Sequence, residues 1–68
     1  METSIRNHLK GKVKDIVLGE VVSEVEIETP AGVVASVITT RSVKRLNLKA
    51  GEEVHAVIKA TAVSVEKP

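Results

Sequence analysis

The feature that most constrains this chain is its lack of bulky core-forming side chains: its 68 residues include no Phe, Tyr or Trp and no Cys. A domain of this size buries only about 60% of the surface of its unfolded chain, so its core is small from the outset. Here the core must be built from Val, Ile, Leu and Ala, which bury less area than an aromatic ring, and no disulfide can reinforce it. We therefore expect a single domain, residues 1–68, that gains stability by self-association.

The charge of the chain argues against partners held by bulk electrostatics. The net charge is +1, too small for strong non-specific binding to nucleic acid or to acidic membranes. A basic stretch precedes an acidic one: Arg6, Lys10, Lys12 and Lys14, then Glu20, Glu24, Glu26 and Glu28. Such runs usually form solvated strand faces. Packing of one chain's basic strand against another's acidic strand is the alternative.

Hydropathy predicts no association with membranes. No stretch approaches the ~20 apolar residues that a membrane span needs. The first residues also lack the apolar segment of a signal peptide. We therefore expect a cytoplasmic protein.

Short apolar segments separated by turn residues predict an all-β fold. Five strands are expected, over residues 9–17, 21–28, 33–39, 53–60 and 61–66. Gly11 is expected to mark a bend or bulge in the first strand. The second strand alternates between aliphatic and glutamate side chains, whereas the third is apolar on both faces and is expected to be buried on both.

The periodicity changes after the third strand. Thr40 suits the N-cap position of a short helix over residues 41–47. Five strands with one short helix between the third and fourth is the element order of a partly open, OB-type Greek-key barrel. Because the exposed strand edges of such a barrel invite pairing with other chains, this fold also favours an oligomer.

Residues suited to catalysis or metal binding are scarce. His8 and His55 are far apart and show no metal-ligand spacing, the acidic residues lie on strand faces, and the four glycines form no phosphate loop. We therefore expect neither an enzyme nor direct protein–metal bonds. An OB-type nucleic-acid-binding module is the alternative, but such modules stack bases on aromatic side chains, which this chain lacks.

What remains is a set of hydrogen-bond donors in three parts of the chain. They are Ser4, Arg6 and Asn7 in the opening, Thr39 at the end of the third strand, and Lys59, Ala60 and Thr61 at the junction of the last two strands. A tetrahedral oxyanion has acceptors only, so hydroxyls, backbone N–H groups and cations suit it. Each such feature is also common singly as a helix cap, a turn or a solvated lysine, so spacing alone favours that structural interpretation slightly over an anion site.

The same residues resemble molbindins. Residues 4–13, Ser-Ile-Arg-Asn-His-Leu-Lys-Gly-Lys-Val, are similar to the opening motif of that family, a small residue and Arg-Asn followed by Leu-Lys-Gly and a valine strand. Residues 35–46 are similar to its third strand and helix, and residues 48–54 and 57–61 to its closing segments. Ile5 and His8 depart from the alanine and glutamine common at these places, and His8 could make binding depend on pH.

The resemblance implies a function. Molbindins are OB-type barrels that exchange strands in pairs, assemble into hexamers and hold molybdate between subunits. By position, Ser4 and Arg6 of one chain would face Thr39 of a neighbouring chain. Asn7 belongs to the same opening motif as Ser4 and Arg6. The remaining contacts would come from Lys59, Ala60 (through its backbone N–H) and Thr61. The resemblance thus implies a cytoplasmic homo-oligomer that binds molybdate or tungstate for storage, homeostasis or delivery.

Overall fold

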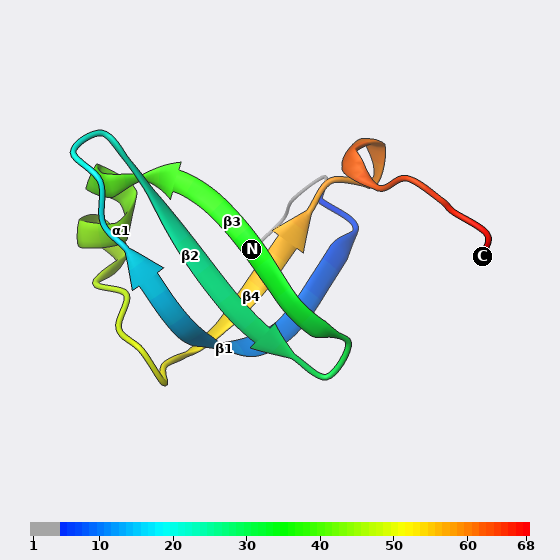
Figure 1. Ribbon diagram of the computed structural model, residues 1–68, viewed down its shortest axis with the longest axis horizontal. Coiled ribbons are helices and arrows are strands. Elements are labelled where there is room, and N and C mark those ends of the chain that lie inside the picture. The colour runs from blue at the N-terminus through cyan, green and yellow to red at the C-terminus, as the bar shows by residue number, and fades with distance from the viewer. Residues whose placement is uncertain (1–4) are drawn as a thin grey trace.

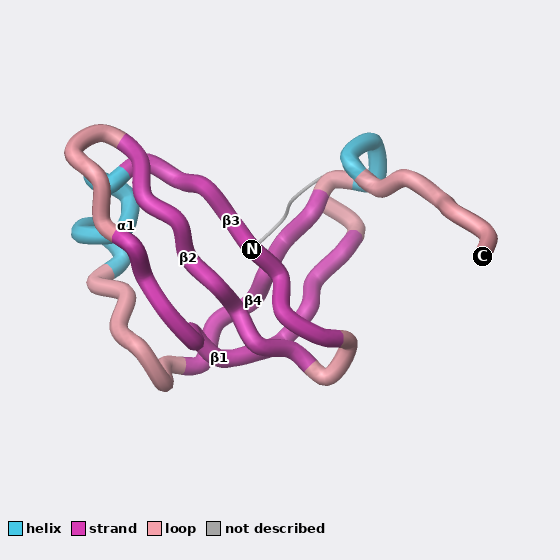
Figure 2. Tube along the Cα trace, viewed as in Figure 1, coloured by secondary structure: helices cyan, strands magenta, loops and turns pink. Residues whose placement is uncertain are grey.

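The computed structural model describes residues 5–68 (Figure 1). Along the chain lie the strands β1 (Asn7–Val17), β2 (Val22–Thr29) and β3 (Gly32–Thr39), the helix α1 (Thr40–Leu46), the strand β4 (Glu53–Ile58) and a 3₁₀ turn, η1 (Ala60–Ala62). The strands form one antiparallel sheet in the order β3-β2-β1-β4. The sheet curls so that its two edge strands, β3 and β4, line a common groove, and α1 lies at one end (Figure 2).

The sheet curls about β1, which pairs with two other strands. Residues 7–12 pair with β4 and residues 12–17 pair with β2. At Gly11 a Cβ would collide with the carbonyl oxygen of Glu28, so glycine is needed for the two strands to approach this closely. The register shift itself comes after Val13. The bulge expected at Gly11 therefore lies further along the strand, and Gly11 provides the close approach at the bend.

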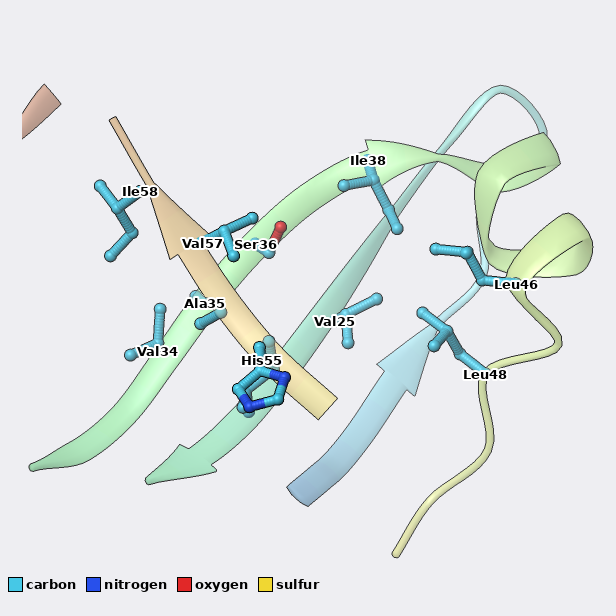
Figure 3. Close-up of a pocket in the computed structure, with 12 residues that line it drawn as sticks. Val25, Val34, Ala35, Ser36, Ile38, Leu46, Leu48, His55, Val57 and Ile58 are labelled. Atoms are coloured by element: carbon cyan, nitrogen blue, oxygen red, sulfur yellow. The ribbon is translucent and has the colours of Figure 1, made fainter. Parts of the chain in front are cut away.

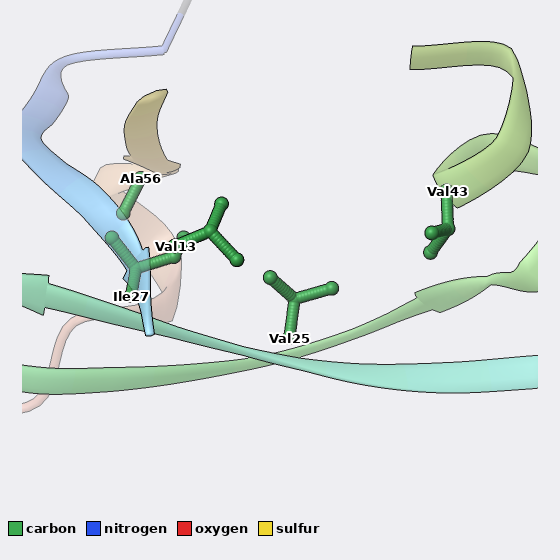
Figure 4. Packing of buried hydrophobic residues seen from close by; sticks show 5 residues of the cluster. All are labelled: Val13, Val25, Ile27, Val43 and Ala56. Carbon is green, nitrogen blue, oxygen red and sulfur yellow. The ribbon is translucent and has the colours of Figure 1, made fainter. Parts of the chain in front are cut away.

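The core is small and entirely aliphatic (Figure 4). Its buried members are Val13, Val25, Ile27, Val43 and Ala56, contributed by β1, β2, α1 and β4. Burying one valine or isoleucine side chain contributes roughly 1.5–3 kcal/mol. Four such residues and one alanine offset only part of the conformational entropy lost by a folding chain. This is the small core that the composition predicts.

The helix begins one residue earlier than predicted. Thr39 is the N-cap, with its Oγ1 accepting a hydrogen bond from the Ser42 N–H at 3.1 Å, and Thr40 is the first helical residue. Asn47 ends the helix in the left-handed conformation, with φ 52°, and donates its N–H to the Lys44 carbonyl. Two consecutive threonines made the start of the helix ambiguous in the sequence, because either hydroxyl can cap a helix.

The prediction of a fifth strand over residues 61–66 is wrong for the single chain. β4 ends at Ile58, η1 follows, and residues 63–68 are exposed and unpaired, with Val65 95% exposed. This tail projects away from the sheet (Figure 1). The sequence pattern of the tail suits a strand, but a strand forms only where its backbone N–H and carbonyl groups find partners, and η1 leads the tail away from both sheet edges of its own chain.

The prediction that β3 is buried on both faces is also wrong for the single chain. Val34 and Ile38 face the core and are half-buried, whereas Val33 and Val37 on the outer face are 48% and 67% exposed. Nothing in residues 5–68 covers this outer face. An apolar pattern on both faces predicts that both avoid water, but it does not identify what covers them.

Candidate anion-binding site

One group of predicted donors lies where β1 begins and β4 ends. Asn7 pairs with Ile58 in the sheet, and its Nδ2 donates to the Ile58 carbonyl at 3.2 Å. Arg6 immediately precedes this pair and Lys59 immediately follows it, so the structure brings together donors that are about fifty residues apart in the sequence. Both cations are exposed, and neither forms an ion pair within residues 5–68. We call Arg6, Asn7 and residues 59–61 the opening half-site.

The turn after β4 provides the backbone donors of the opening half-site. η1 is closed by a 2.9 Å hydrogen bond from the Ala62 N–H to the Lys59 carbonyl, and the Val63 N–H bonds the Ala60 carbonyl at 3.2 Å. In the described part of the chain the N–H groups of Ala60 and Thr61 have no hydrogen-bond partner. Free N–H groups are usual at the start of a helical turn, and they suit an anion. Ser4, the remaining donor predicted here, lies outside the described residues.

Thr39 lies at the other end of β1, beside α1. Its Oγ1 accepts from the Ser42 N–H and donates to the Ser42 Oγ at 2.8 Å. Because Thr39 has a single hydroxyl proton, it is Ser42 that retains a proton to donate outward. Ser42 is therefore a candidate donor that the sequence analysis missed, and its signal was its position three residues after the cap.

Thr39 also lines an open hollow of about 410 Å³ with Glu20, Val21 and Arg41. The exposed Arg41 guanidinium adds a cation to the hydroxyls, whereas the Glu20 carboxylate opposes an anion. We call Thr39, Ser42 and this hollow the helix half-site. The two half-sites lie at opposite ends of β1, a strand of 11 residues. A single chain therefore does not bring Arg6 and Thr39 together.

Neither histidine belongs to a metal site in the structure. The Nε2 of His8 lies 3.2 Å from the Ile5 carbonyl, which can only accept, so this nitrogen carries the hydrogen. His55 pairs with Lys10 across β4 and β1. Within residues 5–68, no group of three or more His, Asp or Glu side chains could hold a metal ion.

The charged strand faces are largely exposed to solvent. The Nζ of Lys10 lies 2.9 Å from the Oε1 of Glu53, which joins β1 to β4. This hydrogen bond and the opposite charge lower the pKa of Glu53 and raise the pKa of Lys10. Lys12 and Glu28 occupy paired positions of β1 and β2 and are both exposed. In the single chain these charges form solvated faces, as the run pattern predicts.

An apolar groove of about 340 Å³ lies between the two sheet edges (Figure 3). Val34 and Ile38 of β3 and Ile58 of β4 line it, and Leu46 and Leu48 lie at its helix end. Its walls are apolar and therefore suit aliphatic side chains rather than an anion. We call this groove the seam.

Comparison with known proteins shows which family this fold represents. The model of the TOBE domain family matches residues 3–65. The chain belongs to the TOBE domain family. It is 47% identical over 66 residues, 96% of each chain, to the probable molybdenum-pterin-binding protein of Haemophilus influenzae. It is 44% identical to molybdenum-pterin-binding protein 3 of Clostridium pasteurianum, over 96% of this chain and 97% of that one.

Solved structures confirm the resemblance to molbindins. A molybdate-binding protein from Sporomusa ovata superposes with a TM-score of 0.94 at 37% identity, covering 98% of this chain and 100% of that one. The cytoplasmic molybdate-binding protein ModG, solved with molybdate bound, gives 0.83 at 41% identity over 88% of this chain and 43% of ModG. These relatives are named for binding rather than for catalysis. No helix within residues 5–68 is long and apolar enough to cross a membrane.

Proposed function

We propose that this TOBE domain binds molybdate or tungstate as the free oxyanion, between copies of itself, and serves cytoplasmic storage and homeostasis of the anion. The observation that carries the proposal is the division of the donors into two half-sites at opposite ends of β1. Each half-site offers donors of the kind an oxyanion needs, and neither encloses a ligand alone. A neighbouring chain that brings its helix half-site to the opening half-site would complete the pocket.

The chemistry of the donors suits a dianion without protons. Arg6 and Lys59 supply positive charge, Ala60 and Thr61 supply free N–H groups, and Ser42 supplies a hydroxyl proton. Hydrogen bonds to charged groups contribute roughly 1.5–3 kcal/mol each. Four or five of them, less the cost of desolvation, would give micromolar affinity, about −8 kcal/mol. Phosphate, which is partly protonated near neutral pH, would present a donor to a pocket of donors.

The composition favours the oxyanion over a pterin complex as the ligand. The names of the curated relatives pair molybdenum with a pterin. A flat heteroaromatic ring is held best by stacking on aromatic side chains, and this chain has none. The exposed polar half-sites match the small anion instead.

The exposed tail and the seam support assembly by strand exchange. Val63 and Val65 alternate along the tail and are 51% and 95% exposed, while the outer edges of β3 and β4, on either side of the seam, have no strand partner among residues 5–68. A tail from a second copy would supply the fifth strand of the barrel and cover both edges. Exchanged pairs that assemble further into a hexamer would also cover the outer valines of β3.

The test is thermal unfolding of anion-free protein at fixed concentration, with molybdate, tungstate, sulfate or phosphate. Because a ligand that binds only the assembled state stabilises it, molybdate and tungstate should raise the midpoint well above sulfate and phosphate. Arg6→Ala should abolish the shift, whereas Arg45→Ala, which removes an exposed arginine of α1 outside both half-sites, should keep it. If no oxyanion moves the midpoint of an intact oligomer, the proposal is wrong. Salt-sensitive retention on single-stranded nucleic acid would then favour the nucleic-acid-binding alternative.

A further inference from the structure

A closed network of hydrogen bonds lies behind the helix half-site. The Oγ1 of Thr40 donates to the Gly19 carbonyl at 2.8 Å, the Gly19 N–H donates to the Oγ of Ser23 at 3.3 Å, and the two hydroxyl oxygens are 2.6 Å apart. Because the single proton of Thr40 is directed to Gly19, Ser23 must be the donor in the short bond. Ser23 and Thr40 are 3% and 7% exposed. The two hydroxyls are therefore buried, and each has a defined role as donor and acceptor.

This network joins the two walls of the hollow. Thr40 lies between Thr39 and Arg41, which form one wall. Its N–H donates to the Val21 carbonyl at 2.8 Å and its hydroxyl donates to Gly19, so the same residue holds the loop that forms the other wall. Ser23 anchors that loop from β2. A change at Thr40 or Ser23 would thus alter the spacing of the walls without removing any group that lines them.

We propose that the Ser23–Thr40 network sets the width of the hollow and thereby the selectivity of the site among oxyanions of different size. This inference rests on the proposed function. Sulfate has the same charge and shape as molybdate but is smaller, so charge and donor type do not separate the two anions. A hollow of fixed width separates them, because donors held apart for the larger ion reach the smaller one poorly. Close-packed interiors are stiff, so the buried network can hold the two walls of the hollow at a fixed spacing. Ser23 and Thr40 are therefore positioning residues, which act through the groups that line the hollow.

The test compares the dissociation constants of molybdate and sulfate, measured by titration calorimetry on the assembled protein. Thr40→Val keeps the volume of the side chain and removes the hydroxyl, which leaves the Gly19 carbonyl without its donor. We expect molybdate binding to weaken by about tenfold, or roughly 1.4 kcal/mol, and sulfate binding to weaken less, so that the selectivity ratio falls. Ser23→Ala should act in the same direction. Thr40→Ser should restore the ratio, because it restores the hydroxyl.

Thr29→Val is the matched control. Thr29 is also a buried threonine, 8% exposed, and its Oγ1 donates to the Gly32 carbonyl at 2.7 Å, in the β2–β3 hairpin at the far end of the sheet. This variant should lower the melting midpoint while leaving the selectivity ratio unchanged. An unchanged ratio in Thr40→Val, or an equal fall in Thr29→Val, would overturn the inference. If the unmodified protein binds neither anion, it is the proposed function that fails.

Discussion

Replacing both valines of the tail, Val63→Ser with Val65→Ser, is the most direct test of how the barrel is completed. Within residues 5–68 the tail pairs with no strand, and the two side chains are 51% and 95% exposed. Were the chain to function as a monomer, this double change would scarcely affect stability, since exposed surface substitutions usually shift it by less than about 0.5 kcal/mol. If the tail fills the seam of a neighbour, both valines become part of its core.

The structure sets the size of the expected effect. Burying a valine side chain contributes roughly 1.5–3 kcal/mol. Val65 is almost fully exposed and would gain nearly all of this, whereas Val63 would gain about half. The sum is about 2–4.5 kcal/mol for each exchanged tail, which corresponds to a roughly 30-fold to 2,000-fold weaker association. A loss of this size would shift the concentration range over which the oligomer dissociates by the same factor.

Sedimentation velocity over a range of protein concentrations measures this loss directly. The double variant should dissociate at concentrations where the unmodified protein stays assembled, and its melting midpoint should be lower at the same protein concentration. Ser64→Ala is the control, because alternation along an extended tail directs this residue to the opposite face from the valines. If the double variant sediments like the unmodified protein at every concentration, the tail does not occupy the seam, and the assembly has to be explained by another surface.

Three further predictions follow from single contacts. Gly11→Ala places a Cβ against the Glu28 carbonyl. We expect the free energy of unfolding to fall by about 1–3 kcal/mol and the thermal midpoint, measured by circular dichroism, to fall by about 5–20 °C. An unchanged midpoint would contradict the close approach of the two strands. Glu20→Gln removes the carboxylate from the hollow, so molybdate should bind several-fold more tightly, most clearly at low salt. Titration calorimetry measures this affinity, and an equal affinity in the variant would mean that the carboxylate lies away from the bound anion. In Glu53→Gln the partner of Lys10 loses its charge. Because the pKa of Glu53 is lowered in the folded chain, its small stabilising contribution should be present near neutral pH and lost on acidification through that lowered pKa. Denaturant unfolding measures the difference in stability between the variant and the unmodified protein. If that difference were the same in acid as at neutral pH, the prediction would be wrong.

The sequence alone determined the local features of the fold. Short apolar segments separated by turn residues identified β1 to β4, and the threonine pair with the change of period located α1 to within one residue, because side-chain direction and capping depend only on neighbouring residues. The absence of aromatic residues similarly predicted the small aliphatic core, now seen in Val13, Val25 and Ile27. The resemblance to molbindins, confirmed by the family match, also needed only the sequence.

The tertiary structure decided what depends on partners. It left the tail unpaired and the outer face of β3 uncovered, because a pattern of apolar residues encodes the need for burial but not the surface that provides it. It also placed Arg6 and Thr39 at opposite ends of β1 and brought Ser42 to Thr39. These relations depend on how the sheet curls and which strands pair over long sequence distances, and such contacts are a property of the whole packed chain rather than of any local segment.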